Sequence, residues 1–149
     1  MESYIDYCLT HEQLEEAWGS KLPKASEKGY PPLFDDMVYW VLYEGDETVA
    51  YTATLTMPDR KFVLVGNTYV RKDYRGKGLH KVILNLRNSA KHLLGLPKLT
   101  IVNPIEETAR ESLHDTIISL GYVKVLHRMG FIEPQFWDMV KEYDVWCLL

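Results

Sequence analysis

The chain has 149 residues, 46% of them apolar and 26% charged, which is typical of a globular protein and argues against extended disorder. This length predicts one domain over residues 1–149 and excludes a TIM barrel, which needs about 250 residues. Against 21 Asp and Glu there are 17 Lys and Arg, so the net charge is −4 and neither nucleic acid nor an anionic membrane is an expected partner.

The sequence carries no targeting or metal-binding signal. Residues 1–6 have no basic segment followed by an apolar run, and no stretch of about 18 apolar residues occurs, so a cytoplasmic protein is expected. The two cysteines, Cys8 and Cys147, do not suggest a disulfide framework. No cluster of Cys and His side chains predicts a metal site.

The first half of the chain predicts a strand, a helix and then an antiparallel sheet. Residues 5–9 are typical of a short strand, and Thr10 with Gln13 makes a capping box at which a helix begins. Three later runs rich in β-branched and aromatic residues are joined by short turns and predict consecutive antiparallel strands. These runs are residues 37–43, 49–57 and 61–70.

The second half changes to helical periodicity. Apolar residues at helical spacing predict a helix from Leu79 to Leu94, which Gly95 ends. A short apolar strand follows at residues 99–102. The order strand, helix, strand predicts that this strand pairs in parallel with residues 61–70.

The C-terminal part predicts one more helix and two more strands. An asparagine and a proline at 103–104 are typical of a helix start, and Gly121 is typical of its end. Strands are expected at 122–126 and 143–149, with a connection at 134–138. The predicted fold class is α/β, a mixed sheet with antiparallel N-terminal strands and a central parallel βαβ crossover.

The segment from Val70 to His80 carries the clearest functional signal. A predicted strand leads through a loop with Gly76 and Gly78 into a helix. Such a loop binds phosphate, because glycine lets a ligand approach the backbone and the first N–H groups of a helix have no partner within it. Cationic side chains in and beside the segment are Arg71, Lys72, Arg75, Lys77 and Lys81. Neither the P-loop nor the dinucleotide fingerprint fits.

The motif from Arg75 to His80, preceded by Tyr74, resembles the Gln/Arg-x-x-Gly-x-Gly/Ala signature of the GNAT superfamily of N-acetyltransferases. The order of predicted elements is similar to that family over nearly the whole chain. The resemblance implies a GNAT-like fold and transfer of the acetyl group of acetyl-CoA, the acyl donor substrate, to an amine by direct attack in a ternary complex. His80 stands where the family has Gly or Ala, and Ile117 where it often has Tyr.

The resemblance also implies which residues hold acetyl-CoA. Main-chain N–H groups of the motif bind its pyrophosphate, and an N–H near Tyr69 or Val70 donates to the thioester oxygen, where such a donor contributes about 3 kcal/mol. Asn103 lies beside the family's pantetheine path and acts as a helix cap, a cofactor contact or both. The implied cofactor-binding residues are Tyr69, Val70, Arg71, Arg75, Gly76, Lys77, Gly78, Leu79, His80 and Asn103.

The proton-transfer groups are predicted by elimination. Residues 61–70 contain no Asp or Glu that could deprotonate the attacking amine. His114 is the predicted base, because histidine titrates near neutral pH, and Tyr69 is a candidate acid for the departing thiolate. The alternatives are Glu106 and Glu107 acting through water, solvent as the base, and Tyr122 or His127 as the acid.

The expected partners are acetyl-CoA and an amine acceptor, in a monomer or a homodimer. The acceptor is an amine of a small molecule or a peptide. The resemblance implies that the first helix and the loop after it line the acceptor side, and residues 12–32 with Asp35 and Asp36 carry more acid than base, which favours a cationic amine. One alternative function is a non-catalytic CoA-binding module of the same fold. Another is an inhibitory protein whose acidic surface binds a basic partner.

Overall fold

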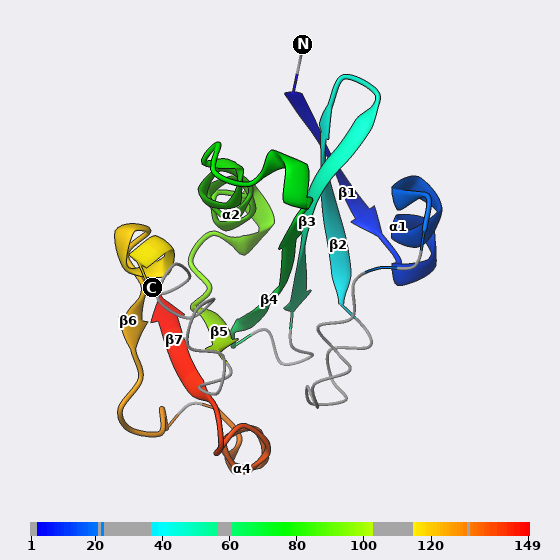
Figure 1. Cartoon of the computed structure of the whole chain (residues 1–149). Helices are drawn as coiled ribbons and strands as arrows, with labels where there is room; N and C mark the ends of the chain where they lie inside the picture. Colours follow the sequence, from blue (N-terminus) through cyan, green and yellow to red (C-terminus); the bar gives the residue numbers. More distant parts are fainter. Residues whose placement is uncertain (1–2, 21, 23–36, 57–60, 103–114, 131) are drawn as a thin grey trace. The chain divides into compact units, whose positions relative to one another are not determined.

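The computed structural model describes residues 3–20, 22, 37–56, 61–102, 115–130 and 132–149 (Figure 1). Within them, strands form a mixed sheet in the order β1-β2-β3-β4-β5-β7-β6, which confirms the predicted α/β class. The chain divides into two compact units, Met1–Leu55 with Gly66–Ala90 and Thr56–Val65 with Lys91–Leu149. No helix in the described part of the chain has the length and apolarity needed to cross a membrane.

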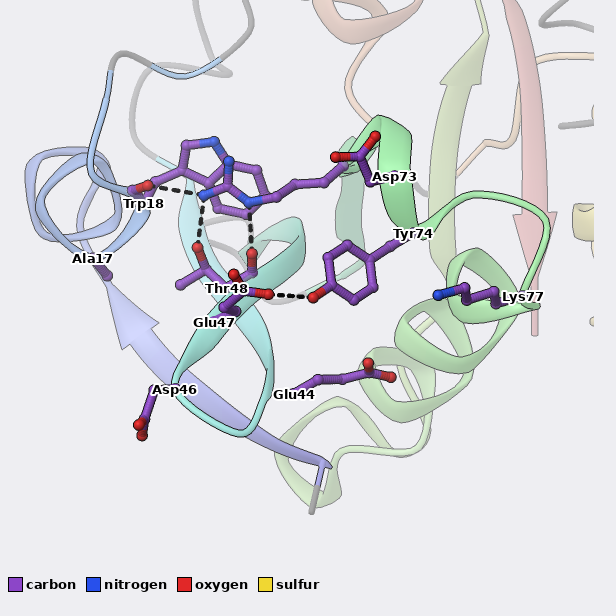
Figure 2. Close-up of a pocket in the computed structure, with 10 residues that line it drawn as sticks. Ala17, Trp18, Glu44, Asp46, Glu47, Thr48, Asp73, Tyr74 and Lys77 are labelled. Atoms are coloured by element: carbon purple, nitrogen blue, oxygen red, sulfur yellow. Dashed lines mark hydrogen bonds between the residues drawn. The ribbon is translucent and has the colours of Figure 1, made fainter. Parts of the chain in front are cut away.

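The first unit is built on an antiparallel hairpin. Its first three strands are β1 (Ser3–Leu9), β2 (Val38–Glu44) and β3 (Glu47–Thr56). The β2–β3 ladder closes with Glu44 opposite Glu47, so the turn consists of Gly45 and Asp46 (Figure 2). Gly45 has a φ of 59°, the left-handed conformation that a two-residue hairpin turn requires. The predicted hairpin is confirmed, and its turn is shorter than the sequence suggested.

Two helices cover the faces of this sheet, α1 (His11–Trp18) and α2 (Leu79–Asn88). Ala50 of β3 packs in a core cluster with Ile83 of α2. The next residue of the strand, Tyr51, contacts Trp18 of α1 with their ring centroids 5.1 Å apart. Because successive side chains of a strand point to opposite faces, α1 and α2 lie on opposite sides of this part of the sheet.

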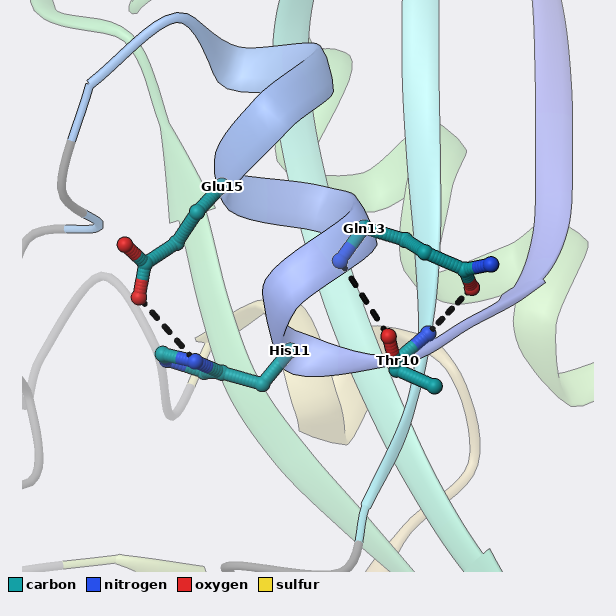
Figure 3. Close-up of polar contacts among 4 residues, drawn as sticks. All are labelled: Thr10, His11, Gln13 and Glu15. Atoms are coloured by element: carbon teal, nitrogen blue, oxygen red, sulfur yellow. Dashed lines mark hydrogen bonds and ion pairs between the residues drawn. The ribbon is translucent and has the colours of Figure 1, made fainter.

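Helix α1 begins at the predicted capping box (Figure 3). The Gln13 N–H donates to the Thr10 hydroxyl at 3.2 Å, and the Gln13 side chain accepts from the Thr10 N–H at 2.9 Å. His11 and Glu15 lie one turn apart with 3.0 Å between Nδ1 and Oε1. Gly19 ends the helix with a φ of 84°. The predicted start of this helix is confirmed, and the helix ends at Trp18, before Leu22, which the apolar spacing had included in it.

The predicted helix from Leu79 to Leu94 is wrong in its length. Helix α2 ends at Asn88, and a 3₁₀ turn, Lys91–Leu93, follows it. Val82 and Leu86, which the periodicity assigned to the buried face, are 45% and 42% exposed. Asn88 and Ser89 explain the early end, because Asn and Ser side chains compete with the helix for backbone hydrogen bonds.

In the second unit, the parallel pairing of strands has the predicted direction. Strand β4 (Val63–Val70) pairs in parallel with β5 (Lys98–Val102), from Val63 opposite Lys98 to Val65 opposite Thr100. Strand β7 (Asp144–Leu148) pairs antiparallel with both β5 and the short β6 (Val123–Lys124). Of the predicted helix at 103–121, residues 103–114 lie outside the described part of the chain, and 115–119 are helical.

The predicted connection at 134–138 is wrong, because these residues form helix α4 (Pro134–Met139). Proline stands in the first turn of this helix, where its missing N–H costs nothing. Phe136 and Trp137 are buried, and the Phe136 ring lies 5.0 Å from that of Phe62. Burial of these two aromatic side chains accounts for a helix too short for periodicity to predict.

We expect Thr10→Ala to lower the free energy of unfolding by about 1 kcal/mol, because it removes the acceptor for the Gln13 N–H. Urea denaturation measures this change. Thr10→Ser keeps the hydroxyl and is expected to retain most of the stability. Equal losses in both variants would show that the capping box does not stabilise α1.

Candidate functional site

The segment predicted to bind phosphate lies in the first unit, where β4 passes into α2. A 3₁₀ turn, Lys72–Tyr74, follows the strand, and Gly78 is the N-cap of the helix. Gly76 and Gly78 have φ values of 81° and 77°, which disfavour residues with a Cβ. A Cβ placed on either glycine would meet nothing within 4 Å. These glycines are therefore required by the backbone conformation, and the space in front of them is open to a ligand.

Main-chain donors are concentrated at the start of α2. The Val82 N–H donates to the Gly78 carbonyl at 3.2 Å, which is the first bond of the helical ladder. The N–H groups of Leu79, His80 and Lys81 precede it, in the turn whose donors have no acceptor within a helix. Together with the positive end of the helix dipole, they can bind an anion such as a phosphate group.

Arg71, at the start of this segment, donates to two main-chain carbonyls and one side-chain hydroxyl. Its guanidinium donates from Nε to the Thr48 carbonyl at 2.6 Å and from Nη2 to the Thr48 hydroxyl at 2.8 Å (Figure 2). The same Nη2 donates to the Trp18 carbonyl at 2.8 Å, and the guanidinium carbon lies 3.8 Å from the centre of the Trp18 ring. Arg71 thus joins β4 to β3 and to the last residue of α1.

The next side chains of the segment contact aromatic rings or neighbouring strands. The Tyr74 hydroxyl donates to the Glu47 carboxylate, and this bond raises the pKa of Tyr74 because it favours the neutral phenol. Arg75 donates from Nε to the Val70 carbonyl at 3.0 Å, and Lys77 lies 5.0 Å from the centre of the Tyr74 ring. Arg75 and Lys77 are exposed, so both cations can contact an anion in solution.

Carboxylates flank the cationic segment. Arg71, Tyr74 and Lys77 share a surface cavity of about 780 Å³ with side chains of the β2–β3 turn (Figure 2). Its acidic lining residues are Glu44, Asp46, Glu47 and Asp73. The positive character predicted from the sequence is therefore confined to the loop and the helix start, with negative charge beside it.

His80 lies half-buried in the first turn of α2. Burial, and secondly the Arg87 guanidinium, lower the pKa of His80 from its ordinary value, because both disfavour the imidazolium. Arg87 itself is 2% exposed and donates to the Thr52 hydroxyl at 2.9 Å. That hydroxyl lies 2.8 Å from the hydroxyl of Thr68 in β4. A buried cation thus links α2 to both neighbouring strands.

Tyr69 has its side chain in an aromatic cluster. Its ring lies 5.8 Å from that of Tyr51 and 6.0 Å from that of Trp18, and the Arg75 guanidinium lies 5.2 Å from its centre. Burial raises the pKa of Tyr51, the centre of this cluster. These contacts hold the Tyr69 ring in place. They do not test the predicted role of Tyr69 as an acid, which stays a prediction.

The structure brings the predicted residues from Tyr69 to His80 together in one continuous segment. His114 and Asn103 lie outside the described residues, so their predicted roles stay predictions. The sequence reasoning missed Glu47 and Thr48, which contact the segment from β3. No local signal could have found them, because each lies more than 20 positions from its partner in the chain.

A comparison with models of protein families assigns the chain to a family. The model of the acetyltransferase (GNAT) family matches residues 8–111, so the chain belongs to that family. This confirms the resemblance read from the loop motif and the prediction of an acyltransferase. A comparison with curated proteins finds no match.

Solved structures show the same fold. Diaminobutyrate acetyltransferase from Paenibacillus lautus, in complex with its substrate and coenzyme A, has a TM-score of 0.61 and 13% identity, over 98% of this chain and 93% of that one. The ribosomal-protein-S18-alanine N-acetyltransferase of Escherichia coli has a TM-score of 0.62 and 16% identity, over 98% and 91%. Bacillus subtilis YlbP, in complex with coenzyme A, has a TM-score of 0.58 and 13% identity, over 99% and 96%.

We expect Gly78→Ala to lower the free energy of unfolding by about 1–2 kcal/mol, because a Cβ disfavours the left-handed conformation. Chemical denaturation without ligand measures it. Gly130→Ala is the matched control, since Gly130 also has open space before its Cβ position but no positive φ. An equal loss in the control would contradict the conformational explanation.

We expect stability to rise with pH between about 5 and 7, in part because of His80. Its pKa is lower in the folded chain than in the unfolded one, so the unfolded state binds more protons below the ordinary histidine pKa. His80→Gln is expected to flatten this rise in urea denaturation of the ligand-free protein, and His127→Gln, which replaces an exposed histidine, is the comparison variant. A His80 titration midpoint above the ordinary value by NMR would contradict the expectation.

Proposed function

We propose that the protein transfers the acetyl group of acetyl-CoA to an amine of a small molecule or a peptide. One observation carries the proposal: in a member of the acetyltransferase family, a loop with Gly76 and Gly78 in the left-handed conformation, and with open space at their Cβ positions, leads into the start of helix α2. Phosphate groups of coenzyme A fit such donors, because they need several N–H groups converging on one anion. The exposed Arg75 and Lys77 supply further positive charge.

In the proposed reaction, the amine nitrogen bonds to the thioester carbonyl carbon and the carbon–sulfur bond breaks. The amine loses a proton and the departing thiolate gains one, so the reaction is balanced without a redox partner. A main-chain N–H near Tyr69 or Val70 is proposed to donate to the carbonyl oxygen as it becomes negative. We further propose His114 as the base, Tyr69 as the acid and Asn103 as a contact for the pantetheine arm.

The proposed acceptor is a cationic amine of a small molecule or a peptide. The carboxylates of Glu44, Glu47 and Asp73 support this class, because they give the surface beside the loop a negative potential that attracts cations. The acceptor approaches as an ammonium ion and must lose its proton before it can attack.

A second candidate function is a CoA-binding module without catalysis. It is favoured by the absence of Asp and Glu from β4, which leaves no carboxylate on that strand to deprotonate the amine. Acetylated product in a screen of diverse amines would exclude this candidate.

We expect millimolar acetyl-CoA to raise the melting temperature by on the order of 5 °C, because a ligand that binds only the folded state stabilises it. Gly78→Asp should abolish the shift, since it places a carboxylate at the proposed phosphate site. Gly130→Asp adds the same charge elsewhere and should keep the shift. No shift for the wild-type protein would exclude the proposed function.

A further inference from the structure

We infer that Glu47 and Thr48, the first two residues of β3, form a clamp that positions the glycine loop, residues 75–78, for binding acetyl-CoA. The clamp consists of the two contacts Glu47–Tyr74 and Thr48–Arg71. The expected effect of the clamp on affinity for acetyl-CoA rests on the proposed function. The structural part of the inference, that the clamp orders the loop, does not depend on any ligand.

The Thr48 side of the clamp fixes the point where the loop leaves the sheet. Arg71 follows directly after β4, and its main-chain N–H donates to the Val49 carbonyl at 2.9 Å. Its side chain adds two bonds to Thr48, at 2.6 Å to the carbonyl and 2.8 Å to the hydroxyl. Thr48 is 6% exposed, so these bonds are shielded from competing water.

The Glu47 side of the clamp holds the end of the 3₁₀ turn Lys72–Tyr74, which follows Arg71. The Tyr74 hydroxyl donates to the Glu47 carboxylate, a charge-assisted bond that is stronger than a neutral one. Tyr74 is also packed partly against the α2-side core. Arg71 precedes the 3₁₀ turn and Tyr74 is its last residue, so two adjacent residues of β3 contact both ends of this turn.

The glycine loop depends on such external support. Gly76 and Gly78 have no atoms near their Cβ positions, and Arg75 to Gly78 are exposed, so the loop makes few packing contacts of its own. Glycine also has the largest conformational freedom to lose when a loop is ordered. A clamp that orders the loop in advance lowers the entropy cost of binding a ligand.

The charge of Glu47 supports a positioning role. A carboxylate beside a site for phosphate groups weakens anion binding by repulsion, as does that of Glu44 across the same turn. Glu47 differs from Glu44 in accepting the bond from Tyr74. The bond to Tyr74 gives the Glu47 carboxylate a structural role that offsets its repulsion of an anion. Glu44 carries the same charge beside the same cavity without this bond, so it is the matched control for the effect of charge alone.

The decisive experiment compares Glu47→Ala, Glu44→Ala and Tyr74→Phe in acetyl-CoA binding by isothermal titration calorimetry. Glu47→Ala and Tyr74→Phe should each raise the Kd by about three- to tenfold, because each removes the same hydrogen bond. The double variant should be no weaker than either single one, since the two residues act through one contact. Glu44→Ala should bind as tightly as wild type, or more tightly.

Hydrogen–deuterium exchange of the ligand-free protein provides the second readout. Amides of residues 75–81 should exchange faster in Tyr74→Phe and in Thr48→Val than in wild type and Glu44→Ala. Unchanged exchange in both clamp variants would overturn the clamp itself. Faster exchange with an unchanged Kd would overturn its role in binding. Wild-type protein that binds no acetyl-CoA would instead reject the proposed function, while the exchange data still decide whether the clamp orders the loop.

Discussion

The hydrogen bonds of the Arg71 guanidinium are the interaction on which the first unit of the structure depends. They connect the residue after β4 with the start of β3 and with the last carbonyl of α1. Arginine suits this position, because its planar fork presents several donors in fixed directions and it stays charged. The family resemblance assigned Arg71 to the cofactor. In the structure its donors are directed at protein oxygens, whereas Arg75 and Lys77 remain exposed for a ligand.

Local sequence signals predicted most of the fold, and they failed where burial departs from periodicity. The capping box at Thr10 and the hairpin around Gly45 depend on neighbouring residues, so both could be predicted, although the turn is shorter than the sequence suggested. The length of α2 could not, because the apolar spacing continues past Asn88 to Leu94, which is 65% exposed. Helix α4 was missed because six residues are too few to show a helical period.

The candidate site was predictable to the extent that it is one continuous segment. Gly76 and Gly78 between a strand and a helix specify a left-handed loop and a helix start, and both are found. What the sequence could not predict is the support of that loop by β3. The contacts of Thr48 and Glu47 join residues 23 and 27 positions apart, and they follow from the register of the sheet rather than from any spacing along the chain.

The buried guanidinium of Arg87 has a consequence for how the helix start responds to its surroundings. Arginine does not lose its proton in proteins, so this residue supplies a constant electric field within the sheet–helix interface at any physiological pH. His80 is the titratable group that experiences this field in the first turn of α2. A fall in pH can therefore add a proton to the imidazole of His80, whereas the charge of Arg87 that opposes this protonation stays constant.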